Sequence, residues 1–327
     1  MRKNKLAKNI RFRKETFETA EDYFQHMIEE LGFPDILHFF ESTLITSGNL
    51  QLNIDIHTVS KDAPTLVFVP GTSVYGLCYA ELLYEIGKKG YNIIAMDPRG
   101  HGRSEGSRGD YTIEELMLDV RNVVAHAKTL FNDKVSLMGS SQGGIVSFYL
   151  AAEDLEVDSV ICQNFADLGW EETHTIARYP KLAKLAQPLI RAAGSMFPGL
   201  KVSTLSYLDL KSIKVKYFGN LHNFIVDDPF AISKISLRAA KSLVNAKMAK
   251  RVEEIKLPIF VFQGDKDIVF PLVYTQKIYD RLQCEKQLKV YPNCDHAIMV
   301  ENVDLIKDDI IAWLDRMYEK RDLSLEK

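Results

Sequence analysis

Cysteine is scarce in this sequence of 327 residues, and its four cysteines form no C-x-x-C pair. Cys162 lies in an apolar run and Cys78 in a helical pattern, as small buried residues do, while Cys284 and Cys294 stand alone. This usage argues against a disulfide framework and predicts a protein of a reducing compartment.

Long apolar runs are also missing. No stretch approaches the roughly 18 to 20 continuous apolar residues that a membrane-spanning helix needs. The basic segment 1–5 is not followed by an apolar stretch, so we expect no secretory signal and a cytoplasmic protein. We expect residues 1–16 to be a solvated tail, with weak contact to anionic lipid as the alternative.

Charge of neither sign dominates, because 41 Lys and Arg residues stand against 44 Asp and Glu residues. The formal net charge of −3 gives the chain no overall attraction for nucleic acid, so we expect no nucleic-acid partner. No clustered set of His, Cys, Asp and Glu has metal-ligand spacing. Cys294, Asp295 and His296 are adjacent and cannot easily point at one ion, so we expect neither a metal nor another cofactor.

The sequence does contain enough apolar material, at 46%, for a large core. After residue 64, short apolar runs alternate with helical patterns. The runs are 65–69, 92–96, 135–138, 159–162, 259–262 and 287–291, and the helical patterns are 80–88, 113–130, 144–152, 273–282 and 303–318. Such runs suit strands that are buried on both faces. We therefore predict an α/β fold with a mostly parallel central sheet flanked by helices.

Two regions depart from this alternation. Residues 1–40 are predicted to hold the tail and a helix that begins near Thr19 and ends at Gly32 and Pro34. The core is predicted at 41–167 and 255–327, and it opens with a hairpin of strands at 43–46 and 50–56. Residues 168–254 lack the strand-and-helix rhythm, and we interpret them as an inserted, mostly helical cap.

The candidate nucleophile lies in Gly139-Ser140-Ser141-Gln142-Gly143-Gly144, between a buried strand and a helical pattern. The pattern G-x-S-x-G fits only with Ser141 at its centre. A sharp strand-to-helix turn strains the central residue and leaves no room for side chains two positions away. The turn lifts the hydroxyl to the carboxyl edge of the sheet and directs a helix N-terminus at the reacting centre.

An acid and a base follow in chain order. Asp267 comes after the run 259–262, with Asp265 as the fallback, and His296 comes after the last strand. A base accepts the serine proton, and an acid on its far nitrogen fixes the tautomer. For the oxyanion we expect the backbone N–H groups of Gln142, which follows the nucleophile, and of Thr72, which follows Pro70-Gly71.

From about residue 43 onward, the sequence resembles the α/β-hydrolase superfamily, in which nucleophile, acid and base occur in this order. The segment Asp97-Pro98-Arg99-Gly100-His101-Gly102-Arg103-Ser104 is similar to an architectural loop of that family, which implies that His101 is structural. The sequence looks most like the monoacylglycerol-lipase, lysophospholipase and serine-aminopeptidase-like group, which also carries a helical cap. It departs from that group where Pro70-Gly71 replaces His-Gly.

The resemblance implies a serine hydrolase that cleaves small carboxylic esters of hydrophobic acyl groups through an acyl-enzyme. The segment 176–196 suits a lid over an acyl chain near a membrane surface, or a helix packed on the core with a basic face in solvent. One alternative is a peptidase that would hold the substrate amine with Glu171, Glu172 or Asp227-Asp228. Others are C–C bond hydrolysis and a non-catalytic ligand receptor.

Overall fold

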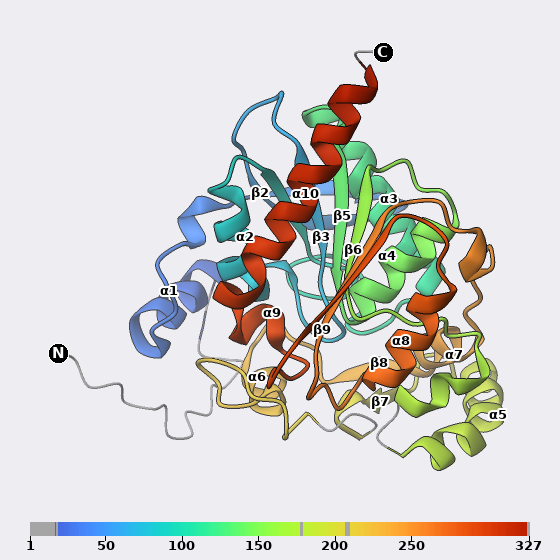
Figure 1. The fold of residues 1–327 in the computed structure, drawn as a ribbon. Coiled ribbons are helices and arrows are strands. Elements are labelled where there is room, and N and C mark those ends of the chain that lie inside the picture. Colours follow the sequence, from blue (N-terminus) through green and yellow to red (C-terminus); the bar gives the residue numbers. More distant parts are fainter. Residues whose placement is uncertain (1–16, 18, 177–178, 207–209, 326–327) are drawn as a thin grey trace.

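The fold is built on one eight-stranded sheet (Figure 1). The computed structural model describes residues 17, 19–176, 179–206 and 210–325; the predicted tail 1–16 lies outside them. The strand order is β1-β2-β4-β3-β5-β6-β9-β10, with β1–β2 and β2–β4 antiparallel and the other pairs parallel. The strands are β1 (Glu41–Ser47), β2 (Leu50–His57), β3 (Thr65–Val69), β4 (Asn92–Met96), β5 (Val135–Ser140), β6 (Ser159–Gln163), β9 (Ile259–Gly264) and β10 (Lys286–Tyr291). The mostly parallel sheet predicted from the apolar runs is confirmed.

Helices cover both faces of this sheet (Figure 1). On one face, α2 (Ala80–Gly87) packs against α10 (Val303–Leu325), and on the other α3 (Ile113–Leu130) packs against α4 (Gln142–Ala152). Strands β3 to β6 and β9 are buried along their whole length, as expected for strands with helices above and below. Helix α8 (Leu272–Arg281) follows β9, and the short α9 (Ile298–Glu301) precedes α10.

Local sequence signals explain where several elements begin and end. Thr19 and Thr112 each accept the N–H of the third residue of the following helix, in the reciprocal pattern of a capping box, and so begin α1 (Ala20–Leu31) and α3. Gly32 ends α1 in the left-handed conformation, at φ 74°. The predicted hairpin is present as β1 and β2, and β1 is an exposed edge strand.

Residues 168–254 connect β6 to β9 and lie below the sheet in Figure 1. Besides the helices that the sequence predicted here, the segment contains two short strands, because β7 and β8 pair into an antiparallel ribbon and α7 follows β8 directly. Strands of three residues are too short to show an alternating pattern in the sequence. The elements are η3 (Glu171–Ile176), α5 (Pro180–Met196), β7 (Lys201–Ser203), η4 (Thr204–Ser206), α6 (Leu221–Asp227), β8 (Lys234–Ser236), α7 (Leu237–Asn245) and η5 (Val252–Glu254).

Helix α5 packs along α7 and leaves a stripe of leucines in solvent. Leu182, Leu185 and Leu189, spaced by three and four residues, are 62%, 73% and 71% exposed. Among the basic residues of the segment 176–196, Lys184 pairs with Glu171 and Arg191 donates to Asn245, while Arg178 lies outside the described residues. Helices α5 and α7 therefore form a packed pair, and α5 also has an apolar stripe that faces solvent.

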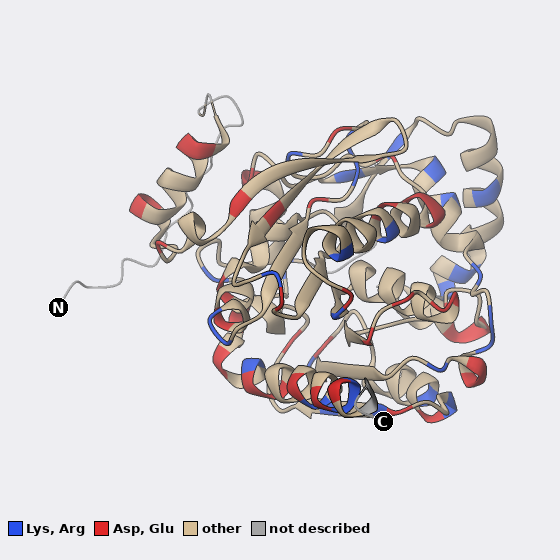
Figure 2. Cartoon of the chain, turned by 90° about the horizontal axis from the view of Figure 1, so that it is seen from above, with Lys and Arg blue, Asp and Glu red and all other residues tan. Residues whose placement is uncertain are grey.

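Acidic and basic side chains are interspersed over most elements (Figure 2). Helix α1 differs, because all its charged residues are acidic, at Glu21, Asp22, Glu29 and Glu30. Within the described ranges, no helix is both long enough and apolar enough to cross a bilayer.

Candidate active site

Ser141 occupies a strained turn between β5 and α4. Its backbone has φ 52° and ψ −115°, a conformation that residues with side chains rarely adopt. Its N–H donates to the carbonyl oxygen of Gln163 at the end of β6, at 2.9 Å. The helix begins at Gln142, two residues before the predicted start at Gly144, so Ser141 stands directly at the helix N-terminus.

The glycines around Ser141 occupy positions that have no room for a side chain. A Cβ on Gly139 would lie 2.2 Å from the carbonyl oxygen of Gly143, and a Cβ on Gly143 would lie 2.1 Å from that of Val69. A Cβ on Gly144 would lie 2.3 Å from the carbonyl oxygen of Asn164. Contacts this short cannot exist, so β5 and α4 reach this close approach only with glycine at these positions.

The structure brings the three predicted side chains into one chain of hydrogen bonds. His296 Nε2 lies 3.1 Å from Ser141 Oγ, and His296 Nδ1 lies 2.9 Å from Asp267 Oδ2. With the Nδ1–H donated to Asp267, Nε2 is left to accept the serine hydroxyl proton. The fallback Asp265 is exposed and instead accepts the N–H of Asn293, at 2.7 Å.

Asp267 is buried and accepts four hydrogen bonds. Its Oδ1 accepts the N–H groups of Val269 and Phe270, at 2.8 and 2.9 Å, and its Oδ2 accepts from His296 and from Asn164 Nδ2, the latter at 3.0 Å. The Phe270 ring also stacks on the His296 ring, with centroids 5.7 Å apart and planes at 7°. These contacts fix both the carboxylate and the imidazole in place.

The two charged partners shift each other's pKa in opposite directions. Burial acts to lower the pKa of His296, but the charge and hydrogen bond of Asp267 outweigh it and raise that pKa above the ordinary value. Burial likewise acts to raise the pKa of Asp267, but the charge and hydrogen bond of His296, together with two backbone N–H groups, lower it. The imidazolium that forms when His296 takes a proton is therefore stabilised.

Sequence reasoning missed two polar residues that support this chain of bonds, Gln163 and Asn164 at the end of β6. Gln163 Nε2 donates to the carbonyl oxygen of His296 at 2.9 Å, and Gln163 Oε1 accepts from Ser140. Asn164 reaches Asp267, as described above, from a left-handed backbone conformation at φ 64°. The available signal was a pair of amides directly after the buried run 159–162.

The loops that carry Asp267 and His296 cross at Gly264. A Cβ on Gly264 would lie 2.0 Å from the carbonyl oxygen of Cys294. The N–H of Lys266 donates to that same oxygen, at 2.9 Å, and the N–H of Asp265 donates to the carbonyl of Tyr291 at 3.0 Å. The end of β9 and the loop after β10 are thus bonded together backbone to backbone.

The two predicted oxyanion donors lie on either side of Ser141. Gln142 is the first residue of α4, where N–H groups have no partner within the helix. Thr72 lies in the loop after β3, and its hydroxyl donates to Gln142 Oε1 at 3.1 Å, which joins the two segments. Gly71 lies in a tight position, because a Cβ there would lie 3.2 Å from the Tyr79 hydroxyl oxygen.

Ser141 and His296 open into a mostly apolar pocket. Part of the lining comes from residues 168–254, namely Leu210, Val215, Lys216, Tyr217, Phe218, Leu221, Phe224 and Ile225. Glu81 is the acidic residue of the lining, and it is bonded to Lys216 Nζ at 3.1 Å and to the Tyr217 hydroxyl at 2.7 Å.

Comparison with known proteins identifies the family. The sequence profile described as "Serine aminopeptidase, S33" matches residues 60–303, which is most of the chain. The chain is an α/β-hydrolase of this family. It is similar to the monoacylglycerol lipase of Mycolicibacterium smegmatis, with 25% identity over 278 residues, 82% of this chain and 94% of the relative. It is also similar to a non-heme haloperoxidase of Rhodococcus erythropolis, with 24% identity over 72% of this chain and 86% of that protein.

A solved structure has the same fold as this α/β-hydrolase. A soluble variant of monoglyceride lipase from Saccharomyces cerevisiae, in complex with a substrate analogue, superposes with a TM-score of 0.70. The identity is 18%, and the match covers 85% of this chain and 95% of that one. The solved structure therefore shows a shared fold, and the sequence comparison shows similarity to a monoacylglycerol lipase.

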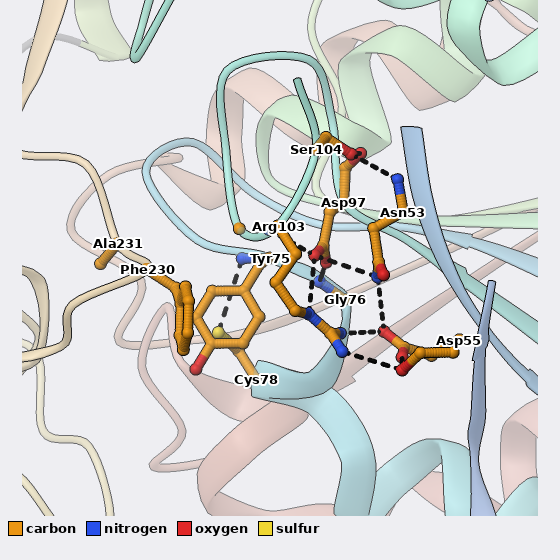
Figure 3. Close-up of polar contacts among 12 residues, drawn as sticks. Asn53, Asp55, Tyr75, Gly76, Cys78, Asp97, Arg103, Ser104, Phe230 and Ala231 are labelled. Atoms are coloured by element: carbon orange, nitrogen blue, oxygen red, sulfur yellow. Dashed lines mark hydrogen bonds and ion pairs between the residues drawn. The ribbon is translucent and has the colours of Figure 1, made fainter. Parts of the chain in front are cut away.

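A buried ionic network supports the loop after β3 in this hydrolase (Figure 3). Asp97 Oδ1 accepts the N–H of Gly76 at 2.9 Å, and Arg103 pairs with both Asp97 and Asp55. Asn53 donates to the same two carboxylates. The network connects β2, the loop after β4 and the loop that carries Thr72, so the segment 97–104 has the architectural position that the resemblance implies.

His101 takes no part in the chain of hydrogen bonds at Ser141. His101 is buried, its Nδ1 pairs with the carbonyl oxygen of Arg99 at 2.9 Å, and its ring lies against Tyr111. Burial lowers the pKa of His101 to about 4, so the ring is neutral at neutral pH. In the part of the chain that the structure describes, no group of three or more His, Cys, Asp or Glu residues could hold a metal ion.

Proposed function

We propose that this protein is a serine hydrolase that cleaves carboxylic esters of hydrophobic acyl groups through an acyl-enzyme. One observation carries the proposal: Ser141 Oγ lies 3.1 Å from His296 Nε2, at the edge of a mostly apolar pocket. The similarity to monoacylglycerol lipases, whose names state a lipid ester as substrate, supports the same chemistry.

The proposed reaction has two halves. In the first, His296 Nε2 takes the Ser141 proton while Oγ attacks the ester carbonyl, and the N–H groups of Gln142 and Thr72 hold the resulting oxyanion. His296 then gives its proton to the departing alcohol, which leaves an acyl group on Ser141. In the second half, His296 activates water, which attacks that acyl group and restores the serine. Asp267 holds the imidazole in the correct tautomer throughout.

In this proposal, residues 168–254 act as a cap that supplies much of the acyl site. Most of the residues that they contribute to the lining are apolar, and Lys216 is the charged one. Burying a hydrocarbon chain there is favourable by about 0.8 kcal/mol for each methylene group. A polar acyl group would lose its bonds to water without finding partners, so the lining favours hydrophobic acyl chains.

The acids that a peptidase would need are committed elsewhere. Asp228 is fully buried and bonded to two tyrosine hydroxyls, Glu171 pairs with Lys184, and Glu172 pairs with Lys277. None of these carboxylates lines the pocket, and neither does that of Asp227. The acid that does, Glu81, is already paired with Lys216. These contacts favour an ester over a peptide with a free amine.

A fluorophosphonate probe tests the nucleophile. The probe should label the wild type and should not label Ser141→Ala, because only an activated serine reacts with it. Ser140→Ala is the matched control, since Ser140 is the neighbouring hydroxyl and donates to Gln163 instead. Labelling of Ser141→Ala would overturn the assignment. An unlabelled wild type would favour a ligand receptor that keeps the fold without the chemistry.

A panel of p-nitrophenyl esters from acetate to palmitate, beside an aminoacyl nitroanilide, tests the bond that is cleaved. We expect the esters to be hydrolysed and kcat/KM to rise from acetate toward longer chains. A higher kcat/KM for the nitroanilide than for every ester would replace the esterase by the peptidase.

A further inference from the structure

Helix α1 lies ahead of the part of the chain that matches the family, yet it reaches the active-site pocket. The family match begins at residue 60, whereas Met27 and Phe33 line the same pocket as Ser141 and His296. Both side chains are almost completely buried, at 6% and 7% exposure. Figures 1 and 2 both draw the helix at the same margin of the molecule.

The sequence of α1 explains how it presents these side chains. Tyr23 and Met27, four residues apart, are its buried face, and its acidic residues cover the outer face. After Gly32 the chain reverses, and the N–H of Phe33 donates back to the carbonyl oxygen of Met27 at 3.0 Å. Phe33 then packs edge-on against Tyr217 of the pocket lining, with centroids 5.4 Å apart.

A buried cluster of Tyr23, Tyr75 and Asp228, which we call the Asp228 clasp, holds the helix in this position. The hydroxyls of Tyr23 and Tyr75 both donate to Asp228 Oδ2, at 2.6 and 2.9 Å. Asp228 Oδ1 accepts the N–H groups of Phe230 and Ala231, at 2.7 and 2.9 Å. The four donors satisfy a carboxylate that has no access to solvent.

The clasp joins three parts of the molecule that matter to the pocket. Tyr23 comes from α1, Tyr75 from the loop after β3 that also carries Thr72, and Asp228 from the end of α6. The ring of Phe230 packs against both tyrosines, with centroids 5.6 and 5.8 Å away. Helix α1 is therefore docked by specific buried bonds to elements of the site as well as by apolar contact.

We propose that α1 is a wall of the acyl pocket and that Met27 and Phe33 set which acyl chains fit. The inference rests on the proposed ester hydrolysis and assigns the apolar end of the substrate to a segment outside the matched family core. Met27 and Phe33 offer only carbon and sulfur to a ligand, so the group that they contact is hydrocarbon rather than the polar alcohol part of the ester. Each methylene that they cover should improve binding by about fourfold.

The test compares two tryptophan substitutions on the same helix. Met27→Trp adds bulk to the pocket wall, whereas Ile28→Trp adds the same bulk at the next residue, which does not line the pocket. We expect Met27→Trp to lower the palmitate-to-acetate ratio of kcat/KM at least tenfold, and Ile28→Trp to keep the wild-type ratio. A ratio that is the same in all three proteins would overturn the role of α1.

Two further variants keep the test informative where Met27→Trp does not fold. Met27→Ala enlarges the pocket and should move the preferred acyl length toward longer chains. Tyr23→Phe removes one donor of the clasp and should raise KM for long-chain esters more than for acetate, because it loosens the wall and leaves the reacting groups in place. An unchanged chain-length profile in both folded variants would also overturn the proposal.

Failure of this inference can be told apart from failure of the proposed function. A wild type that takes no fluorophosphonate label and hydrolyses no ester overturns the hydrolase, and the acyl wall with it. A wild type that hydrolyses esters with a chain-length profile that the Met27 and Tyr23 variants leave unchanged overturns the acyl wall alone.

Discussion

Two buried carboxylates of this hydrolase, Asp267 and Asp228, are surrounded by donors in the same way. On each, Oδ1 accepts the backbone N–H groups two and three residues further along the chain. On each, Oδ2 accepts two side-chain donors from distant parts of the sequence. The geometry around the two carboxylates is therefore alike, although one lies at Ser141 and the other in the clasp that holds α1.

The difference lies in the donors. One of the two side-chain donors to Asp267 is His296, whose second nitrogen faces Ser141. Both side-chain donors to Asp228 are tyrosine hydroxyls. Contact with the titrating imidazole lowers the pKa of Asp267 despite burial, while burial raises the pKa of Asp228 against the pull of its four hydrogen bonds. In the proposed mechanism, the bonds around Asp267 support proton transfer, because its donor His296 also faces Ser141. The bonds around Asp228 attach α1 instead.

The largest effect that separates the two carboxylates is expected from Asp267→Asn. An amide cannot stabilise the imidazolium and favours the wrong tautomer of His296, so kcat should fall by about 10⁴-fold. The measurement is steady-state hydrolysis of a p-nitrophenyl ester, with circular dichroism to show that the fold is kept. A fall of less than tenfold would remove Asp267 from the proposed mechanism.

Asp228→Asn should have the opposite profile. Its amide NH₂ must face either two tyrosine hydroxyls or two backbone N–H groups, which leaves buried donors without an acceptor and lowers the free energy of unfolding by about 3 kcal/mol. Urea denaturation measures the loss. The kcat for p-nitrophenyl acetate should fall far less than in Asp267→Asn. An equal fall would contradict the different roles proposed for the two carboxylates.

A smaller effect is expected from Asn164→Gly, which removes one of the four donors to Asp267. Glycine tolerates the positive φ of this position, so the substitution avoids the backbone strain that alanine would add. Loss of a bond to a charged acceptor should lower kcat by about tenfold, which is about 1.4 kcal/mol. Asn164→Ala is the companion variant. If its kcat equals that of Asn164→Gly while its stability is lower, the backbone strain affects stability and the lost bond affects kcat. A wild-type kcat in Asn164→Gly would contradict the positioning role of Asn164.

The smallest effect concerns the acidic limb of the kcat/KM profile. His296 must be neutral to accept a proton, and its pKa is raised, so it holds its proton to a higher pH than an ordinary histidine. Activity should therefore be lost, as pH falls, at a pH above the ordinary histidine value of about 6.5. In Asp267→Asn, the charge that raises the pKa of His296 is absent, so the acidic limb of its residual kcat/KM should move to lower pH. A limb that stays in place would mean that another group titrates.

The sequence was sufficient for those parts of the site that rest on local rules. The sharp turn at Ser141 has its signal in the neighbouring glycines, and the α/β alternation predicted the mostly parallel sheet. Asn164 carries no such signal, because its partner Asp267 lies 103 residues away. Tyr23 and Asp228 are 205 residues apart, and the pattern of neither segment indicates the other.

Asp228 shows the limit most clearly. An acid in residues 168–254 was a reasonable candidate to hold a substrate amine, but the structure bonds it to Tyr23 and Tyr75 instead. Tertiary packing decides between these two roles of Asp228, because it places Tyr23 of α1 next to the carboxylate. The ribbon of β7 and β8 was missed for a related reason, because each of these short strands forms by pairing with the other.

The absence of a side chain at Gly264 has a consequence for how fast the protein becomes competent to react. Because the end of β9 and the loop after β10 touch backbone to backbone there, acid and base cannot separate without breaking several main-chain bonds. In the proposed mechanism, the distances between acid, base and nucleophile are therefore set before substrate binds, and no slow assembly step precedes attack by Ser141. Covalent capture of Ser141 should start at full speed on mixing, without a lag.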